Sequence, residues 1–269
     1  MGSFSLESDV LGDPNFPTRT LAKRSVSKSA LYQDLYSRYS RLVFTFSADR
    51  SIAIAGLEKR LLLASNTQGA YGVSDYRSLL WMRAADVSSL LKIEELRHTK
   101  IPTWSWMAYQ GAIQYLDIPY RGIEWLGEEV LLPWRVNSEG GDHPAVEKEL
   151  SATIRPRGAY YFAGDDISTA DQELSATIRP SKQGFQNMLT TNGTIVLDMP
   201  EVDHDWQKLR YATIGRSKLT TNMPLEGKRM YAILLVLPQD DKYYERVGVG
   251  LVPSTCLQME DQGEQVKIR

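Results

Sequence analysis

The sequence predicts an α+β fold in which two N-terminal helices pack on a mostly antiparallel β sandwich or barrel. Apolar residues recur with helical spacing only before about residue 65. From residue 76 onward they alternate with a period of two and aromatic residues become frequent, which is typical of strands. Turn-forming pairs such as Gln110-Gly111 and Asn192-Gly193 separate these segments. A run of helices followed by a run of strands indicates the α+β class.

Two segments, at about residues 31–44 and 52–64, have the spacing of amphipathic helices. Each follows a serine, Ser29 or Ser51, that can cap the first turn. In both segments, apolar side chains recur every three or four residues, with polar side chains between them. We expect the helices to pack on the β-rich body through Leu35, Leu42, Leu57 and Leu61.

Nine later segments are predicted to be strands, because they alternate or are rich in β-branched and aromatic residues. Their ranges are 79–81, 103–109, 112–116, 123–126, 159–162, 194–197, 211–214, 230–237 and 244–251. The longest apolar run, at 231–237, is far shorter than the roughly 20 residues of a membrane-spanning helix. It is therefore predicted to be a buried strand.

Three regions divide the chain. Residues 1–28 are polar and interrupted by Pro14 and Pro17, so they are predicted to form an extended arm. A single α+β domain is expected over 29–258, and a polar tail over 259–269.

Two segments within the predicted domain are unusual. The charged, glycine-bearing stretch 137–149 is the candidate for a mobile loop. The octapeptide at 149–156 recurs unchanged at 173–180. Two copies are too few for a solenoid, so we expect a local tandem duplication at the surface. A duplicated hairpin that enlarges one wall of the fold is the alternative.

The composition excludes several classes of protein. The 269 residues carry 31 Lys and Arg against 33 Asp and Glu, a net charge of −2, and this balance argues against nucleic acid as a partner. The single cysteine, Cys256, excludes a disulfide framework and a zinc ribbon. With no secretory signal and no membrane-spanning run, a cytoplasmic protein without a membrane partner is expected.

Sequence motifs for common catalytic chemistry are missing. There is no Gly-x-Ser-x-Gly elbow and no phosphate-binding loop. Gly248-Val249-Gly250 lacks the third glycine of a dinucleotide fingerprint and fits a closely packed strand. The three histidines lack metal-ligand spacing, so neither a cofactor nor a metal is expected.

One stretch of 28 residues, from His98 to Trp125, concentrates three Trp, three Tyr, one His and two carboxylates. Strand alternation would place Trp104 and Trp106 on one face and Tyr109 on the other. Flat side chains beside proton donors and acceptors suit the binding and conversion of an apolar molecule. The candidate catalytic residues are His98, Tyr109, Asp117 and Glu124, and the candidate ligand-binding residues are Trp104, Trp106, Tyr115, Tyr120 and Trp125.

An ordinary structural interpretation of the same stretch stays open. Two tryptophans close together bury a large area, so Trp104 and Trp106 also fit a core pair. Charged residues that flank a turn, such as Asp117 and Glu124, are usually solvated. The sequence does not decide between a pocket and a core.

Four segments, at 35–42, 49–58, 79–81 and 102–109, follow one another in an order that resembles the region after the HET domain of fungal heterokaryon-incompatibility proteins. The stretch 244–250 also resembles the end of that region, so the resemblance spans about 30–255. The motifs of the HET domain itself are not present in the first 30 residues. The resemblance implies a fungal source and offers no catalytic residues to carry over.

Two functions from different classes follow. The first is a recognition or regulatory module of the HET-family type, which binds a protein or a small molecule. The second is a cofactor-independent enzyme of fungal natural-product biosynthesis, such as a cyclase, isomerase or dehydratase, with an aromatic-lined pocket. The sequence leaves the oligomeric state open.

Overall fold

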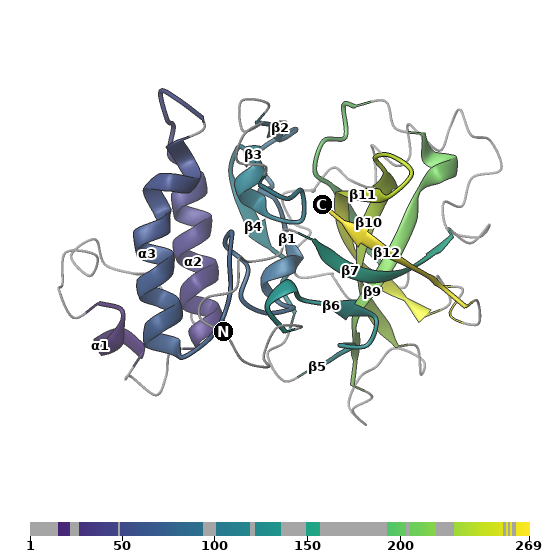
Figure 1. Cartoon of the computed structure of the whole chain (residues 1–269), viewed down its shortest axis with the longest axis horizontal. Helices are drawn as coiled ribbons and strands as arrows, with labels where there is room; N and C mark the ends of the chain where they lie inside the picture. Colours follow the sequence, from purple (N-terminus) through teal and green to yellow (C-terminus); the bar gives the residue numbers. More distant parts are fainter. Residues whose placement is uncertain are drawn as a thin grey trace. The chain divides into compact units, whose positions relative to one another are not determined.

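Two long N-terminal helices precede a β-rich region in the computed structural model, which confirms the predicted α+β class (Figure 1). The structure describes residues 16–21, 27–47, 49–93, 101–118, 122–135, 149–156, 193–202, 205–218, 229–254, 257, 259 and 262–269. The chain divides into two compact units. Unit 1 holds the described residues up to Ile101 and Ser105–Tyr115, and unit 2 holds Pro102–Trp104 and the described residues from Leu116 to Arg269.

Unit 1 is built from helices and two small sheets. Its helices are α1 (Thr18–Leu21), α2 (Lys28–Ser40) and α3 (Asp49–Ser65), and α2 and α3 lie side by side (Figure 1). Its antiparallel strand pairs are β1 (Trp81–Arg83) with β4 (Ile113–Tyr115), and β2 (Leu91–Lys92) with β3 (Tyr109–Gln110). Short 3-10 helices cover Ser78–Leu80 and Trp106–Ala108. Helix α2 packs against β4.

Both predicted helices are confirmed, but their buried residues differ in part from the expectation. Leu35 and Leu61 are buried, and Leu57 is half-buried. Leu42 is exposed, so its predicted core position is wrong. The physical reason is that α2 ends at Ser40, two residues before Leu42, and the helical spacing no longer decides where a side chain points after that residue.

Unit 2 contains a mixed five-stranded β-barrel. Its strands are β7 (Leu150–Pro156), β9 (Arg210–Ser217), β10 (Met230–Pro238), β11 (Tyr243–Pro253) and β12 (Glu264–Ile268). The order is β9-β10-β11-β12-β7, and β7 pairs with β9 to close the ring. Only the β11–β12 pair among these is parallel. Of the two predicted alternatives, the structure shows the barrel.

Three further strands and two 3-10 helices extend the barrel. Strand β5 (Ile123–Trp125) pairs with β9, β6 (Val130–Leu131) with β7, and β8 (Thr194–Leu197) with β11. The 3-10 helices cover Pro133–Arg135 and Trp206–Lys208. The strands predicted at 123–126, 194–197, 211–214, 230–237 and 244–251 are therefore confirmed with small shifts of their ends. The strand predicted at 159–162 and most of the loop at 137–149 lie outside the described residues.

The strand predicted at 103–109 is wrong. Residues 103 and 104 form a turn, Trp106–Ala108 form a 3-10 helix, and only Tyr109–Gln110 are extended. The Ser105 hydroxyl donates a hydrogen bond to the carbonyl of Tyr71 at 2.6 Å, and its oxygen accepts one from Met107 N at 3.0 Å. A capping serine with a distant acceptor therefore overrides the local alternation.

One barrel strand comes from a segment that was expected to lie at the surface. The first copy of the repeat forms β7, and its Leu150, Ala152 and Ile154 are buried. Cross-strand register places Ala212 and Leu234 on the same interior face. The expectation that this copy lies at the surface is wrong, and the second copy, at 173–180, lies outside the described residues.

The chain ends are also more structured than the sequence predicted. The predicted polar tail contributes β12, whose Ile268 is fully buried. In the predicted extended arm, Thr18–Leu21 form α1 and Phe16 is buried. The guanidinium of Arg60 on α3 donates a hydrogen bond to the carbonyl of Phe16. Long-range partners supplied by α3 and by β7 stabilise these polar segments.

Candidate protein-interaction surface

The two tryptophans of the predicted site are core residues. Trp104 in unit 2 is fully buried, and its ring lies edge-on to Trp134, with centroids 6.3 Å apart. Trp106 in unit 1 is also fully buried, with its ring 5.4 Å from that of Tyr36 and 6.1 Å from that of Tyr39. The structure has no strand that carries both tryptophans on one face.

Two predicted tyrosines belong to the small sheets of unit 1. Tyr109 is buried, and its ring centroid lies 5.5 Å from that of Trp81. Tyr109 is therefore a core residue of unit 1, and it does not lie on a separate strand face opposite the two tryptophans as the alternation predicted. Tyr115 is half-buried on β4, where its backbone pairs with Trp81.

The remaining predicted residues belong to unit 2 or lie outside the described residues. Asp117 is exposed, and Trp125 is half-buried on β5. Glu124 is exposed, and Arg216 donates two hydrogen bonds to its carboxylate at 2.8 and 3.1 Å. These bonds hold the pKa of Glu124 below its ordinary value, which favours an ionised carboxylate rather than a proton donor. His98 and Tyr120 lie outside the described residues.

A groove in unit 2 has a volume of about 430 Å³ where the β10–β11 turn meets β12. Five charged side chains line it: Asp240, Asp241, Lys242, Glu264 and Lys267. Tyr244 is the only aromatic residue among its lining residues, and none of the predicted site residues is among them. The groove therefore differs from the aromatic-lined pocket that the sequence suggested.

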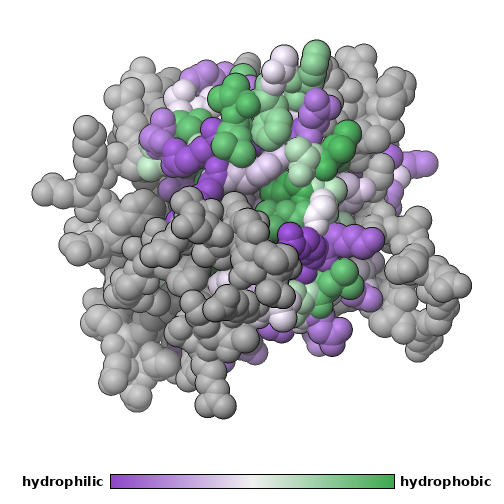
Figure 2. Space-filling view, turned by 90° about the vertical axis from the view of Figure 1, so that its left-hand side faces the viewer, coloured by the Kyte–Doolittle hydropathy of each residue, from purple (hydrophilic) through white to green (hydrophobic). Residues whose placement is uncertain are grey.

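Unit 1 has an exposed apolar surface that the sequence analysis missed. Five large apolar side chains are exposed along the α2–α3 loop and α3: Leu42 (54%), Val43 (89%), Phe46 (66%), Ile52 (72%) and Leu63 (72%). We call these residues, with Gly56 and Lys59 between the last two, the α3 surface. Figure 2 views the molecule from the side on which α3 lies in Figure 1, and hydrophobic groups gather among the coloured atoms of that face. Exposed apolar residues that cluster in this way mark interaction sites more often than singly scattered ones do.

The outward part of α3 forms one stripe. Ile52, Gly56, Lys59 and Leu63 follow one another at spacings of four, three and four residues, and all four are exposed. At 3.6 residues per turn these positions lie within about 60° of one another around the helix axis. Ile54 and Leu61 are buried on the opposite side. Helix α3 therefore carries apolar side chains on its outer face as well as on its inner face.

A buried arginine fixes the loop at the start of α3. Arg50 is buried, and its Nη2 donates to the carbonyl of Ser40 at 2.9 Å and to that of Gly111 at 3.2 Å. Its guanidinium carbon lies 5.4 Å from the centroid of the Trp106 ring. The hydroxyl of Tyr39 donates to the carbonyl of Arg50 at 2.6 Å. These contacts join the end of α2 to the start of α3 across the exposed loop.

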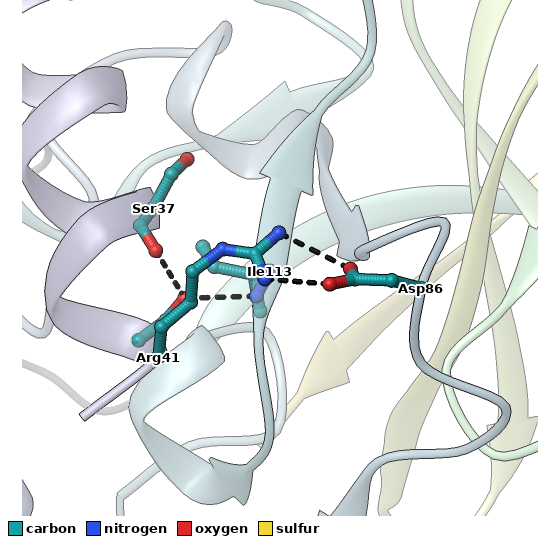
Figure 3. Close-up of polar contacts among 5 residues, drawn as sticks. Ser37, Arg41, Asp86 and Ile113 are labelled. Atoms are coloured by element: carbon teal, nitrogen blue, oxygen red, sulfur yellow. Dashed lines mark hydrogen bonds and ion pairs between the residues drawn. The ribbon is translucent and has the colours of Figure 1, made fainter. Parts of the chain in front are cut away.

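The end of α2 is anchored a second time, as Figure 3 shows. The hydroxyl of Ser40 donates to the carbonyl of Ser37 at 2.7 Å, and its oxygen accepts from Ile113 N of β4 at 2.8 Å. Arg41 donates to both carboxylate oxygens of Asp86, at 2.7 and 3.1 Å. Because both ends of the loop are held, Leu42 and Val43 are presented by a supported backbone.

A half-buried carboxylate lies on another side of α3. Glu58 accepts a hydrogen bond from Gly72 N at 2.5 Å, yet burial raises its pKa above the ordinary value. The pKa values of Tyr36 and Tyr71 are also raised, first by burial and then by the charge of Glu58. Gly72 has a φ of +76°, and a Cβ there would collide with the indole nitrogen of Trp106. The residues around Glu58 are therefore closely packed.

We predict that Glu58→Gln makes the protein more stable near pH 7. Because the pKa of Glu58 is raised in the folded state, the folded protein binds its proton more tightly than the unfolded chain does. That stabilisation is complete below the ordinary carboxyl pKa of about 4.3 and is lost as the pH rises through the folded pKa. Glutamine removes the buried charge, and its amide oxygen can still accept the Gly72 N–H.

Urea unfolding followed by tryptophan fluorescence, at about pH 7 and below the ordinary carboxyl pKa of about 4.3, checks this. The midpoint of Glu58→Gln should exceed that of the parent only at the higher pH. Glu128→Gln, at an exposed carboxylate, is the control and should change neither. A lower midpoint for Glu58→Gln at both pH values would contradict the prediction.

No family model, no curated protein and no solved structure matches the chain. Among the described residues, no helix is long and apolar enough to cross a membrane. Nor does any cluster of three or more His, Cys, Asp or Glu side chains in the described ranges have an arrangement that could hold a metal ion.

Proposed function

We propose that the chain is a recognition module that binds a protein partner through the α3 surface. The observation that carries this proposal is the exposure of five large apolar side chains on one loop and the helix that follows it, each at least 54% exposed. Removing apolar area from water contributes roughly 25 cal/mol per Å², so a partner that covers these side chains gains stability.

The contacts that hold the α2–α3 loop in place suit the α3 surface to recognition of a partner. Contacts of Arg50, Ser40 and Arg41 hold both ends of the α2–α3 loop before any partner arrives. A binding surface that is already ordered loses less conformational entropy on association. The partner therefore meets apolar groups in a fixed arrangement rather than a loop that it must first order.

The resemblance to the region after the HET domain of fungal incompatibility proteins belongs to this proposal, as does a cytoplasmic setting. A recognition module needs no catalytic group, which agrees with the missing catalytic motifs. The enzyme alternative gains less support, because Trp106 and Tyr109 are buried in the core of unit 1 and Glu124 is held by Arg216.

Site-specific photocrosslinking in cells tests the proposal. A photoreactive phenylalanine analogue replaces Val43 or Ile52, both exposed on the α3 surface, or Lys218 as the exposed control in unit 2. We expect a discrete adduct from the first two positions and none from Lys218. Adding Leu63→Asp should abolish the adduct formed at Ile52 without changing the thermal midpoint, because Leu63 is exposed.

Two results would contradict the proposal. One is an adduct pattern that is the same at Lys218 as at Val43 and Ile52. The other is an adduct at Ile52 that persists in Leu63→Asp.

A further inference from the structure

We infer that the partner docks on α3 as an acidic amphipathic helix, whose backbone approaches α3 most closely at Gly56. This inference rests on the proposed function and adds the chemistry of the partner to it. Three observations carry it: an unexplained glycine, the spacing of the outward stripe, and the sign of its charge.

No contact within the described part of the chain explains why residue 56 is a glycine. It lies in the middle of the 17-residue helix α3, where glycine costs about 0.5–1 kcal/mol relative to alanine. A Cβ added at Gly56 would meet nothing within 4 Å. Gly72, in contrast, is required by its φ of +76° and by the indole of Trp106. A missing side chain on an exposed helical face leaves room for another backbone to approach closely.

The exposed stripe around Gly56 has the length and residue spacing of a surface on which a second helix can pack. Ile52 lies one turn before Gly56, and Leu63 lies two turns after it. The spacing of four, three and four residues matches the alternation of core positions in a helix–helix seam. From Ile52 to Leu63 the stripe spans about 16 Å, at 1.5 Å per residue, which suits about three turns of a partner helix. Apolar anchors on both sides of a small residue fit the helix-in-groove mode of recognition.

The charge of the stripe favours an acidic partner. Lys59 is exposed within the stripe and has no ion pair among the described residues. Arg60 beside it is also exposed at the helix surface, with its guanidinium donating to the carbonyl of Phe16. The two acidic residues of α3 are Asp49, at the first position, and Glu58, which is half-buried on another side. The outward face between Ile52 and Leu63 therefore carries positive charge and no acidic residue.

The same charges disfavour a second copy of this chain. If two α3 helices packed antiparallel across their midpoints, Lys59 and Arg60 of one copy would lie close to Lys59 and Arg60 of the other. Like charges placed together across an interface are destabilising. A partner helix with Glu or Asp beside its apolar stripe avoids this repulsion and pairs with Lys59.

Fluorescence anisotropy of labelled peptides with the full chain tests the inference. Three helical peptides of about 18 residues are compared. The first has leucines at core positions flanked by Glu, the second has the same leucines flanked by Lys, and the third is a scramble of the first. We expect the acidic amphipathic peptide to bind at least about tenfold more tightly than the other two, because only it matches both the apolar stripe and its charge.

Variants of α3 test separately the close approach at Gly56 and the charge preference set by Lys59. Gly56→Leu should weaken binding of the acidic peptide by about tenfold or more, because the added side chain blocks close approach. The thermal midpoint should be retained or raised, because the position is open and leucine favours the helix more than glycine does. Lys59→Glu should transfer the preference to the basic peptide. Lys218→Glu, at an exposed lysine of unit 2 that is not part of the α3 surface, is the matched charge control and should change neither the affinity for the acidic peptide nor the preference between the peptides.

Each other outcome overturns the inference. Equal binding of the three peptides would contradict docking of an acidic helix. Binding of the acidic peptide that Gly56→Leu leaves unchanged would contradict it as well. A dimer in sedimentation velocity that Gly56→Leu abolishes shows that a second copy occupies the stripe. If no peptide binds while the Ile52 adduct stays sensitive to Leu63→Asp, the helical partner is wrong and the proposed function holds. If the adduct also fails, the proposed function fails with it.

Discussion

Asp198→Ala is expected to lower the free energy of unfolding by about 3–5 kcal/mol, because it removes a buried carboxylate that forms an ion pair with a buried guanidinium. Asp198 and Arg246 have side chains that are 0% exposed, and the two groups meet through hydrogen bonds of 3.0 and 3.2 Å. Asp198 directly follows β8, and Arg246 lies on β11. The pair therefore joins two neighbouring strands inside unit 2.

The backbone around the pair is also held. Asp198 N donates to the carbonyl of Val247 at 2.9 Å, and Arg246 N donates to the hydroxyl oxygen of Thr103 at 3.0 Å. These bonds keep the backbone at Arg246 in place after the Asp198 carboxylate is removed, so the guanidinium, whose side chain is 0% exposed, cannot easily reach water. The desolvation cost of the charge then appears in the unfolding free energy.

An exposed pair of the same chemistry is the control. Arg216 and Glu124 also share two hydrogen bonds, at 2.8 and 3.1 Å, but both are open to solvent. Glu124→Ala should therefore change stability far less than Asp198→Ala. Urea unfolding of both variants, followed by tryptophan fluorescence, measures the difference. Equal losses in the two variants would show that burial does not decide the strength of these pairs.

Trp106→Ala is expected to destabilise the protein by about 3–5 kcal/mol, since a fully buried indole is replaced by a cavity. The ring packs against Tyr36 and Tyr39, and Arg50 lies over it at 5.4 Å. Its removal takes away an aromatic neighbour of both tyrosines and the support for the arginine that joins α2 to α3. The change tests directly whether Trp106 belongs to the core or to a ligand site.

Phe46→Ala provides the matched comparison. Phe46 is aromatic as well, but it is 66% exposed on the α3 surface. Its removal should alter the unfolding free energy by less than about 0.5 kcal/mol, as is usual for surface positions. Thermal and urea unfolding of the two variants give the comparison. A stable, folded Trp106→Ala protein would contradict the core assignment.

The sequence by itself determined the class of the fold and much of its strand content. The apolar run at 230–237, bounded by turn residues, can bury both of its faces only within a β-rich core, and it forms β10. Leu35 and Leu61 lie on helical stripes that bury in the structure as their spacing predicts. These features depend on local periodicity, which the sequence records directly.

Contacts between distant residues decided the rest. Ser105 forms its hydrogen bond with Tyr71, far away in the chain, and this contact accompanies a 3-10 helix where alternation predicted a strand. The barrel closes because β7 pairs with both β9 and β12. From the sequence, β7 was expected at the surface, and β12 lies in a polar stretch. No local pattern identifies the partner of a strand.

The α3 surface shows most clearly the difference between what local periodicity predicts and what tertiary contacts decide. Ile54 and Leu61 are buried on one side of α3, while Ile52 and Leu63 are exposed on the other. Each pair consists of one Ile and one Leu, so composition does not distinguish them. The helical spacing predicted that Leu57 and Leu61 face the core, but it did not predict a second, exposed apolar face at Ile52 and Leu63. Packing against α2 and the rest of unit 1 covers only one side of a helix. The tertiary structure alone therefore decides which apolar residues remain free to meet a partner.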